Sequence, residues 1–259
     1  AVCAIGTAGT GKAGRMILEK LEELGIDTTT VVSEPHRPTT RKTRVIASSQ
    51  QVLRIDREMK REITDQTLEK LVSHIADKIK NAHLVIISDY DKGLVTRQLM
   101  ARTVAIAREH NVLVLADPKS IDFSKYANVA VMTPNKREAS LAAGMDIKTG
   151  ADLEAAARII MAKAGLEKLL ITCGKDGMAL FDRTDKVVTI ESDARQVFDV
   201  SGAGDTVISI LGLGLASGAG FELSARIANA AAGIVVAKVG TATASVEELK
   251  AVLARTQTC

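Results

Sequence analysis

Short apolar runs of strand length alternate with amphipathic helical patterns through the middle of the chain. Residues 83–88, 112–116 and 129–132 are apolar runs that predict buried strands, and residues 96–109 between the first two have helical spacing. Residues 63–79 place apolar side chains three and four positions apart, which predicts an amphipathic helix. This alternation of strand and helix predicts βαβ units with a parallel sheet and helices on its faces.

Two sections depart from this alternation. Residues 41–57 contain two short runs of alternating apolar and charged residues on either side of a polar tetrad, which predicts a protruding β-hairpin. Residues 168–190 predict three short strands in succession. The remainder is helical, with helices expected over about 204–217, 221–237 and 245–254. With no internal repeat and no low-complexity linker, we expect one α/β domain over residues 1–259.

The composition indicates which types of side chain form the hydrophobic core. Hydrophobic residues make up 46% and charged residues 25% of the chain, as in ordinary globular proteins. The chain has two Tyr, four Phe and no Trp, so the core must consist mainly of Ala, Val, Ile and Leu. That suits helices packed on a parallel sheet. Aromatic platforms for single-stranded nucleic acid are poorly supplied.

Charge and cysteine usage exclude several classes of function. The 34 Lys and Arg against 31 Asp and Glu leave a net charge of +3, too small and scattered to indicate nucleic-acid binding. Three widely spaced cysteines indicate neither a disulfide framework nor a zinc site, and favour a reducing cytoplasm. Polar residues interrupt every apolar stretch well before 18 residues, so no membrane span is expected.

Glycines near the N-terminus fit two nucleotide motifs incompletely. Gly6 to Lys12 spell a P-loop pattern, but Ala13 stands where a hydroxyl would bind Mg²⁺. Gly9, Gly11 and Gly14 match the G-x-G-x-x-G motif of dinucleotide-binding folds. Those folds also have an acidic residue at the end of the next strand, and this chain meets that requirement only in part. A tight strand-to-helix turn explains the same glycines without any ligand. An NAD(P)-dependent oxidoreductase and a non-catalytic nucleotide-binding protein therefore remain alternatives.

The strongest chemical pattern lies in residues 199–206, directly before a predicted helix. Gly202, Ala203 and Gly204 would present unobstructed backbone N–H groups at the helix start, where they can stabilise charge on a transferring phosphoryl group. Asp205 follows them and is placed to accept a proton from an attacking hydroxyl. An aspartate at this position can also simply favour the helix electrostatically.

Residues 199–206 resemble the D-x-x-G-A-G-D motif of the ribokinase-like (PfkB) carbohydrate kinases, and further motifs occur in that family's order. The resemblance implies a three-layer α/β/α sandwich with a mostly parallel sheet and a small β-clasp lid over residues 41–57, through which a homodimer forms. It implies ATP and Mg²⁺ as cofactors. Residues matching the family's nucleotide and metal motifs are Asn135 and Glu138 (N-x-x-E, organising Mg²⁺), Thr172, Gly174 and Gly177 (T-x-G-x-x-G), and Asn229 beside the adenine. A monovalent cation beside the anion hole would involve Asp199 and Ser201.

Further motifs lie in residues 42–44, 50–56, 88–93, 117–119, 122–123 and 238–243. They resemble one branch of the family, the D-glycero-β-D-manno-heptose 7-phosphate kinases of lipopolysaccharide heptose synthesis, which are often fused to an adenylyltransferase. The resemblance implies phosphorylation of the anomeric hydroxyl to give the 1,7-bisphosphate, with Asp205 as the base. Cations suit the sugar phosphate, and carboxylates suit the sugar hydroxyls. The candidate sugar contacts are Lys42, Arg44, Asp56, Asp89, Lys92, Asp117 and Lys119. Another sugar or sugar-phosphate kinase of the same family is the nearest alternative.

One departure from the family pattern concerns the beginning of the chain. The family's opening strand, with an early substrate-binding Asp, and its Gly-Gly-Ala-Ala-Asn-like segment have no counterpart before Ala1. We therefore expect that leading strands of the kinase domain are missing and that the sugar pocket formed by this chain alone is incomplete.

Overall fold

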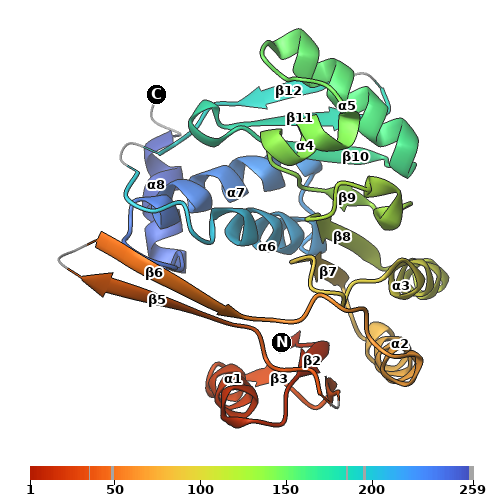
Figure 1. Cartoon of the computed structure of the whole chain (residues 1–259). Coiled ribbons are helices and arrows are strands. Elements are labelled where there is room, and N and C mark those ends of the chain that lie inside the picture. Colours follow the sequence, from red (N-terminus) through yellow and green to blue (C-terminus); the bar gives the residue numbers. More distant parts are fainter. Residues whose placement is uncertain (35, 48–49, 185, 195–196, 257–259) are drawn as a thin grey trace. The chain divides into compact units, whose positions relative to one another are not determined.

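A computed structural model describes residues 1–34, 36–47, 50–184, 186–194 and 197–256 (Figure 1). The chain divides into two compact units. Unit 1 comprises Ala1–Asn81 and Asp91–Ile106, and unit 2 comprises Ala82–Tyr90 and Ala107–Cys259. Each unit is described separately below.

Unit 2 is built on a six-stranded mixed sheet in the order β12-β11-β10-β9-β8-β7. Strands β7 to β10 are parallel, whereas β11 and β12 are added antiparallel at one edge. The parallel strands are apolar along nearly their whole length, as expected for strands covered on both faces. The strands are β7 (Leu84–Ser88), β8 (Leu113–Asp117), β9 (Val131–Met132), β10 (Lys168–Thr172), β11 (Met178–Asp182) and β12 (Val187–Ile190).

Helices cover both faces of this sheet. On one face α6 (Ala203–Ala216) and α7 (Phe221–Val236) pack on the sheet, and α8 (Val246–Thr256) contacts α7. Figure 1 shows α4 (Lys136–Ala143) and α5 (Gly150–Ala164) on the other face. Fully burying an aliphatic side chain stabilises a fold by about 1.5–3 kcal/mol. The core on the α6–α7 side includes Leu115, Leu170, Leu180, Ile208 and Leu211.

Local sequence signals fix the helix ends in unit 2. Asn135 and Glu138 form a reciprocal capping box at the start of α4, and Thr149 and Asp152 form another at α5. Such boxes satisfy N–H groups that a helix start leaves without partners. A left-handed glycine follows each of these two helices, where a side chain would be strained.

Unit 1 contains short parallel strand pairs, a hairpin and helices. β1 (Val2–Cys3) pairs with β3 (Ile26–Asp27), and β2 (Gly6–Ala8) pairs with β4 (Val31–Ser33). The helices are α1 (Lys12–Glu23), α2 (Asp65–Ile79) and α3 (Arg97–Glu109), whose N-terminal part belongs to this unit. Buried Glu34 forms an ion pair of 2.5 Å with Arg37, whose guanidinium also donates to the carbonyl oxygens of Arg61 and Lys92. This charge is therefore fully partnered, as burial requires.

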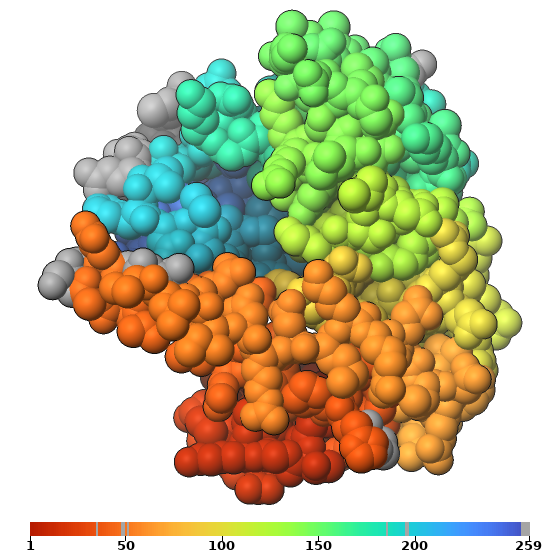
Figure 2. All heavy atoms as spheres, in the orientation of Figure 1, coloured from red at the N-terminus to blue at the C-terminus, as the bar shows by residue number. Residues whose placement is uncertain are grey.

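The predicted hairpin is confirmed as β5 (Arg41–Ala47) paired antiparallel with β6 (Gln50–Arg57), and its turn at Ser48 and Ser49 lies outside the described residues. Its described side chains lie at the surface (orange in Figure 2). The three strands predicted in 168–190 and the three C-terminal helices are also confirmed. The pattern did not predict α4 and α5. None of the described helices has the length and apolar character that crossing a membrane requires.

Candidate active site

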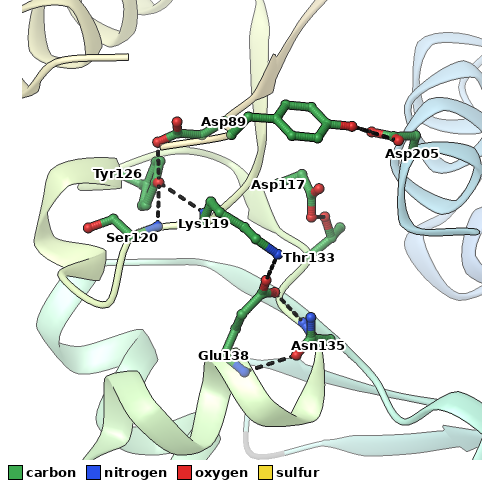
Figure 3. A network of polar contacts seen from close by, with 10 residues as sticks. Asp89, Asp117, Lys119, Ser120, Tyr126, Thr133, Asn135, Glu138 and Asp205 are labelled. Atoms are coloured by element: carbon green, nitrogen blue, oxygen red, sulfur yellow. Dashed lines mark hydrogen bonds and ion pairs between the residues drawn. The ribbon is translucent and has the colours of Figure 1, made fainter. Parts of the chain in front are cut away.

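The candidate site lies at the carboxyl edge of the parallel strands of unit 2. Ser88 at the end of β7 is in register with Asp117 at the end of β8. The backbone N–H of Asp89 donates to the carbonyl of Asp117 and extends this ladder by one residue. The polar side chains that follow these strands therefore emerge next to one another (Figure 3). Ligands of open α/β sheets characteristically bind at this edge.

The start of α6 is open to a ligand. Gly202 has φ +83°, a left-handed conformation that favours glycine, and its carbonyl accepts from the N–H and hydroxyl of Thr206. Gly202 has no side chain to cap the helix, and the N–H groups of Gly204 and Asp205 have no partner among the described residues. A Cβ added at Gly204 would meet no atom within 4 Å. The predicted anion hole thus has free donors and space above them.

Asp205 projects from the first turn of α6 toward the end of β7. The Tyr90 hydroxyl donates to its carboxylate, at 3.1 Å from Oδ1 and 2.9 Å from Oδ2, and the Ser88 hydroxyl lies 3.5 Å from Oδ1. Partial burial, and then the bond to Asp205, raise the pKa of Tyr90 to about 12. Tyr90 therefore stays protonated at neutral pH and remains a donor.

Asp117 lies between two other acidic groups. Its Oδ1 accepts a hydrogen bond of 3.3 Å from the Thr133 hydroxyl. Burial, followed by the charges of Glu138 and Asp205, raises the pKa of Asp117 to about 7. Both carboxylates are thus close enough to Asp117 to favour its protonated form, which persists to about neutral pH.

Asp89 is engaged in a buried network rather than exposed to solvent. Its Oδ2 accepts from the Lys125 ammonium at 2.5 Å and from the Tyr126 hydroxyl at 2.6 Å. Asp89 is 4% exposed and Tyr126 is 0% exposed. The Tyr126 hydroxyl also accepts from the backbone N–H groups of Lys119 and Ser120, at 3.3 and 3.4 Å. The carboxylate of Asp89 therefore anchors the segment after β8, and its predicted sugar contact stays a prediction.

The predicted N-x-x-E pair lies beside Lys119. The Glu138 carboxylate accepts from the Asn135 N–H at 3.0 Å and from the Lys119 ammonium at 2.8 Å. The bond to Glu138 raises the pKa of Lys119, which therefore keeps its charge. Lys119 was predicted as a ligand of the sugar phosphate, and the structure places it against the carboxylate predicted to organise the metal.

The other nucleotide candidates lie at and just after the end of β10 and in the middle of α7. The segment from Thr172 to Gly177 makes a tight turn, in which Gly177 has φ +82° and a Cβ would lie 2.0 Å from the carbonyl oxygen of Ile190. Gly174 also has a positive φ of 62°. The Asn229 amide donates to the Glu191 carbonyl at 2.8 Å and to the Asp193 carboxylate at 3.1 Å. It thus holds the segment after β12, and its predicted place beside the adenine remains untested.

The remaining candidates are distributed over both units. Asp199 accepts the Ser201 N–H at 2.9 Å in the turn before α6. Three candidates on the hairpin, Lys42, Arg44 and Asp56, have exposed side chains in unit 1. Lys92, also in unit 1, forms an ion pair of 2.8 Å with Glu58 and thereby lowers the pKa of that carboxyl. The combination of these unit 1 residues with those of unit 2 into one sugar site stays a prediction.

Close packing explains two of the three glycines in the G-x-G-x-x-G pattern, Gly9 and Gly14. A Cβ at Gly14 would lie 1.7 Å from the carbonyl oxygen of Gly9, and a Cβ at Gly9 would lie 2.8 Å from the backbone of Arg37 and Thr39. Gly9 also donates its N–H to the Thr39 hydroxyl. Gly9 and Gly14 are therefore required by the turn itself, whereas a Cβ at Gly11 would meet no atom within 4 Å.

Sequence reasoning missed three residues of this site: Tyr90, Lys125 and Tyr126. Tyr90 and Tyr126 are the only two tyrosines of the chain, and each donates its hydroxyl to an aspartate. A tyrosine following the last residues of a buried strand, next to a candidate acid, was the available signal for Tyr90. Nothing in the local sequence indicated that Lys125 and Tyr126 reach Asp89.

Comparisons with known proteins give a consistent result. Residues 1–249 match the pfkB family of carbohydrate kinases. The chain is 51% identical over 252 residues to the bifunctional protein HldE of Desulfatibacillum aliphaticivorans, covering 97% of this chain and 52% of that protein. It is 44% identical over 241 residues to the bifunctional protein HldE of Trichlorobacter lovleyi, covering 93% of this chain and 49% of that protein. The chain thus spans about half the length of the curated relatives it matches.

Solved structures with the same fold are more distant in sequence. Arabidopsis thaliana ribokinase complexed with ribose and ATP has a TM-score of 0.79 at 22% identity, covering 97% of this chain and 81% of that chain. Phosphofructokinase-2 from Escherichia coli in complex with potassium has a TM-score of 0.83 at 18% identity, covering 98% of this chain and 82% of that chain. The expected ribokinase-like α/β fold is therefore confirmed.

The raised pKa of Asp117 predicts a pH-dependent change in stability. The folded protein holds a proton there that the unfolded chain releases, so the free energy of unfolding falls as pH rises from about 4 to 7. Asp117→Asn removes this loss. We expect the free energy of unfolding of the variant, relative to wild type, to increase between pH 5 and pH 8 in urea titrations without nucleotide.

Asp182→Asn is the matched control. Hydrogen bonds from Thr184 lower the pKa of Asp182, so its folded and unfolded titrations both lie below pH 5. The stability difference between this variant and wild type should stay constant from pH 5 to pH 8. A constant difference for Asp117→Asn as well would contradict the assignment.

Proposed function

The chain belongs to the pfkB family of carbohydrate kinases, and we propose that it transfers the γ-phosphoryl group of ATP to the anomeric hydroxyl of D-glycero-β-D-manno-heptose 7-phosphate. The product would be the 1,7-bisphosphate, a step of ADP-heptose synthesis for lipopolysaccharide. Support for this sugar comes from the similarity to the two bifunctional HldE proteins and from the residues that resemble the heptose 7-phosphate kinases. Since those relatives are about twice as long, the proposal concerns only their kinase part.

The observation that carries the proposal is the position of Asp205. Its carboxylate stands in the first turn of a helix whose own N–H groups and the space above Gly204 are open. A carboxylate that could act as the base and free N–H donors that could bind an anion thus lie within a few residues of each other, which supports the proposal. Phosphoryl transfer needs little more from a protein than positioning and charge stabilisation.

In the proposed reaction, the protein positions groups and moves one proton. Asp205 accepts the proton of the anomeric hydroxyl. At the same time the anomeric oxygen of the sugar bonds to the γ-phosphorus, and ADP leaves. The N–H groups at the start of α6 stabilise the charge on the transferring group, aided by the positive end of the helix dipole. A protonated Asp117 avoids a further negative charge beside Asp205.

The residues of unit 2 suit a nucleotide bound together with a divalent metal. The nucleotide would supply the phosphoryl group, and the metal would offset the negative charge of the phosphates. Mg²⁺ is usually held by one or two carboxylates together with substrate phosphates, rather than by a full protein cage. Glu138 suits that arrangement, because its carboxylate is held by the Asn135 N–H and is already paired with the Lys119 ammonium. The described residues contain no group of three or more His, Cys, Asp or Glu side chains placed to hold a metal by themselves. A monovalent cation near Asp199 and Ser201 is part of the proposal on the resemblance alone.

The hairpin offers a charged face for the sugar phosphate. Cross-strand partners project to the same side of a two-stranded sheet, and successive residues alternate. The pairs Lys42↔Asp56 and Arg44↔Arg54 therefore share one face, and Arg54 lies 3.0 Å from Asp56 on it. We propose that this face closes over the sugar as the lid. Another sugar kinase of the family remains the alternative.

The opposite hairpin face supports a homodimer. It carries the pairs Thr43↔Ile55 and Val45↔Leu53, and Leu53 and Ile55 are more than half exposed. An exposed apolar face of this kind marks an interaction site. We propose that two copies pair through it, and that the enzyme acts in the cytoplasm on small-molecule substrates, without nucleic acid or membrane partners.

A substrate panel and an Asp205→Asn variant test the proposed reaction. ADP release should be fastest with heptose 7-phosphate, with kcat/KM at least about tenfold above ribose and fructose 6-phosphate. Loss of the base should lower kcat by about 10²–10⁴-fold. Efficient turnover of ribose or fructose 6-phosphate without turnover of the heptose would favour the alternative kinase, and near-normal turnover by the variant would exclude Asp205 as the base.

Gly204→Ala tests the anion hole. The added methyl group meets no protein atom, and alanine favours helices more than glycine, so thermal stability should be equal or slightly higher. Activity should fall strongly because the methyl group occupies the space above the N–H donors. Gly150→Ala, at the first residue of α5 with the same free space, is the matched control and should leave kcat unchanged. Equal activity of both variants would remove the anion hole from the account.

Leu53→Lys tests the apolar hairpin face. Light scattering after size exclusion should show a dimer for wild type and a monomer for the variant, because the substitution places a charge in the proposed interface. Arg54→Gln on the charged face should remain dimeric. A monomeric wild type, or a dimeric Leu53→Lys variant, would contradict the proposed dimer.

A further inference from the structure

Among the side chains that the structure describes, Tyr90 makes the closest hydrogen-bonding contact with Asp205. Its hydroxyl lies within hydrogen-bond distance of both carboxylate oxygens, at 3.1 and 2.9 Å, and so joins the second residue after β7 to the first turn of α6. The other side chain near the carboxylate, Ser88, lies at 3.5 Å, beyond ordinary O–H···O distances. Tyr90 is therefore the main side-chain donor to this carboxylate among the described residues.

The backbone that carries Tyr90 is firmly held. The preceding residue, Asp89, donates its N–H to Asp117 and binds Lys125 and Tyr126 through its buried carboxylate. A cation–π contact of 5.0 Å between Lys125 and the Tyr126 ring tightens this cluster further. The phenol thus extends from a fixed point, and its hydroxyl can define one position for the Asp205 side chain.

The hydrogen bond between Tyr90 and Asp205 suits a general base whose carboxylate must be held in one orientation. An ionised carboxylate has about four lone-pair sites, so a single donated hydrogen bond leaves others for a substrate hydroxyl. Tyr90 keeps its proton at neutral pH, since its pKa is raised to about 12, and so does not compete for the proton that Asp205 accepts. Hydrogen bonds to charged groups are also among the stronger ones in proteins.

We propose that Tyr90 is a positioning residue for Asp205, holding the carboxylate in the orientation from which it accepts the proton of the sugar hydroxyl. The inference rests on the proposed role of Asp205 as the base. Tyr90 acts through Asp205 and not through contact with the sugar or with ATP. Its contribution should therefore appear in kcat and disappear when Asp205 is replaced.

Kinetics of Tyr90→Phe, Asp205→Asn and the double variant test this inference. The phenylalanine variant keeps the ring and loses only the donor, so kcat should fall about ten- to a hundredfold, as expected for one hydrogen bond to a charged group. KM for ATP and for the sugar should stay within about twofold. In the Asp205→Asn background, Tyr90→Phe should cause no further loss. A raised KM for the sugar, or a further loss in the double variant, would overturn the inference.

Tyrosine emission supplies a readout that does not depend on activity. The chain has no Trp and only two Tyr, and a carboxylate that accepts a phenol hydrogen bond quenches tyrosine fluorescence. Asp205→Asn should therefore raise the emission of the wild-type protein, and should leave the emission of Tyr90→Phe unchanged. Equal emission changes in the two backgrounds would contradict the Tyr90–Asp205 contact in solution.

The two proposals fail in different ways. An active Asp205→Asn variant would remove the proposed base, whatever Tyr90 does. An inactive Asp205→Asn variant combined with an unchanged kcat for Tyr90→Phe would leave the proposed function intact and refute the role of Tyr90 alone. Thermal unfolding of each variant, with melting temperatures expected near that of wild type, verifies that the proteins compared are folded.

Discussion

The parallel register of β7 and β8 sets the position of the groups in the candidate site. Pairing of Ser88 with Asp117 brings the two strand ends side by side, and α6 packs against both strands with its N-terminus at the same edge. A shift by one residue would turn the side chains of β7 to the opposite face and remove Tyr90 from Asp205. The apolar packing of α6 on the sheet therefore supports the site's polar geometry.

Burial, followed by nearby negative charge, is the electrostatic cost that Asp117 bears at this edge. The charges of Glu138 and Asp205 both act on Asp117, and the structure offsets each of the three carboxyl groups in a different way. Glu138 binds Lys119, Asp205 receives the Tyr90 hydroxyl and lies in the first turn of α6, and Asp117 holds a proton up to about neutral pH. A site with this arrangement is prepared for a ligand that brings cations of its own.

Much of the fold and part of the site could be predicted from the sequence. Helical spacing identified α2, alternating residues identified the hairpin, and apolar runs identified β7, β8 and β9. The glycine motif located the start of α6. The Ala-rich helices α4 and α5 were missed because alanine weakens the contrast between their apolar and polar faces. Contacts such as Tyr90 with Asp205, or Asp89 with Lys125, join residues far apart in the chain, so no local pattern could specify them. The predicted individual sugar contacts depend on such long-range geometry in the same way.

Phosphorus NMR of the reaction with ATP and heptose 7-phosphate tests the central claim most directly, since it identifies the bond that the site forms. The account predicts that each ADP formed is matched by one new phosphate ester, whose resonance is coupled to the anomeric proton, while the 7-phosphate signal persists. Release of inorganic phosphate in place of that ester, or a new ester on another hydroxyl of the sugar, would contradict the claim that this edge of the sheet transfers a phosphoryl group to the anomeric oxygen.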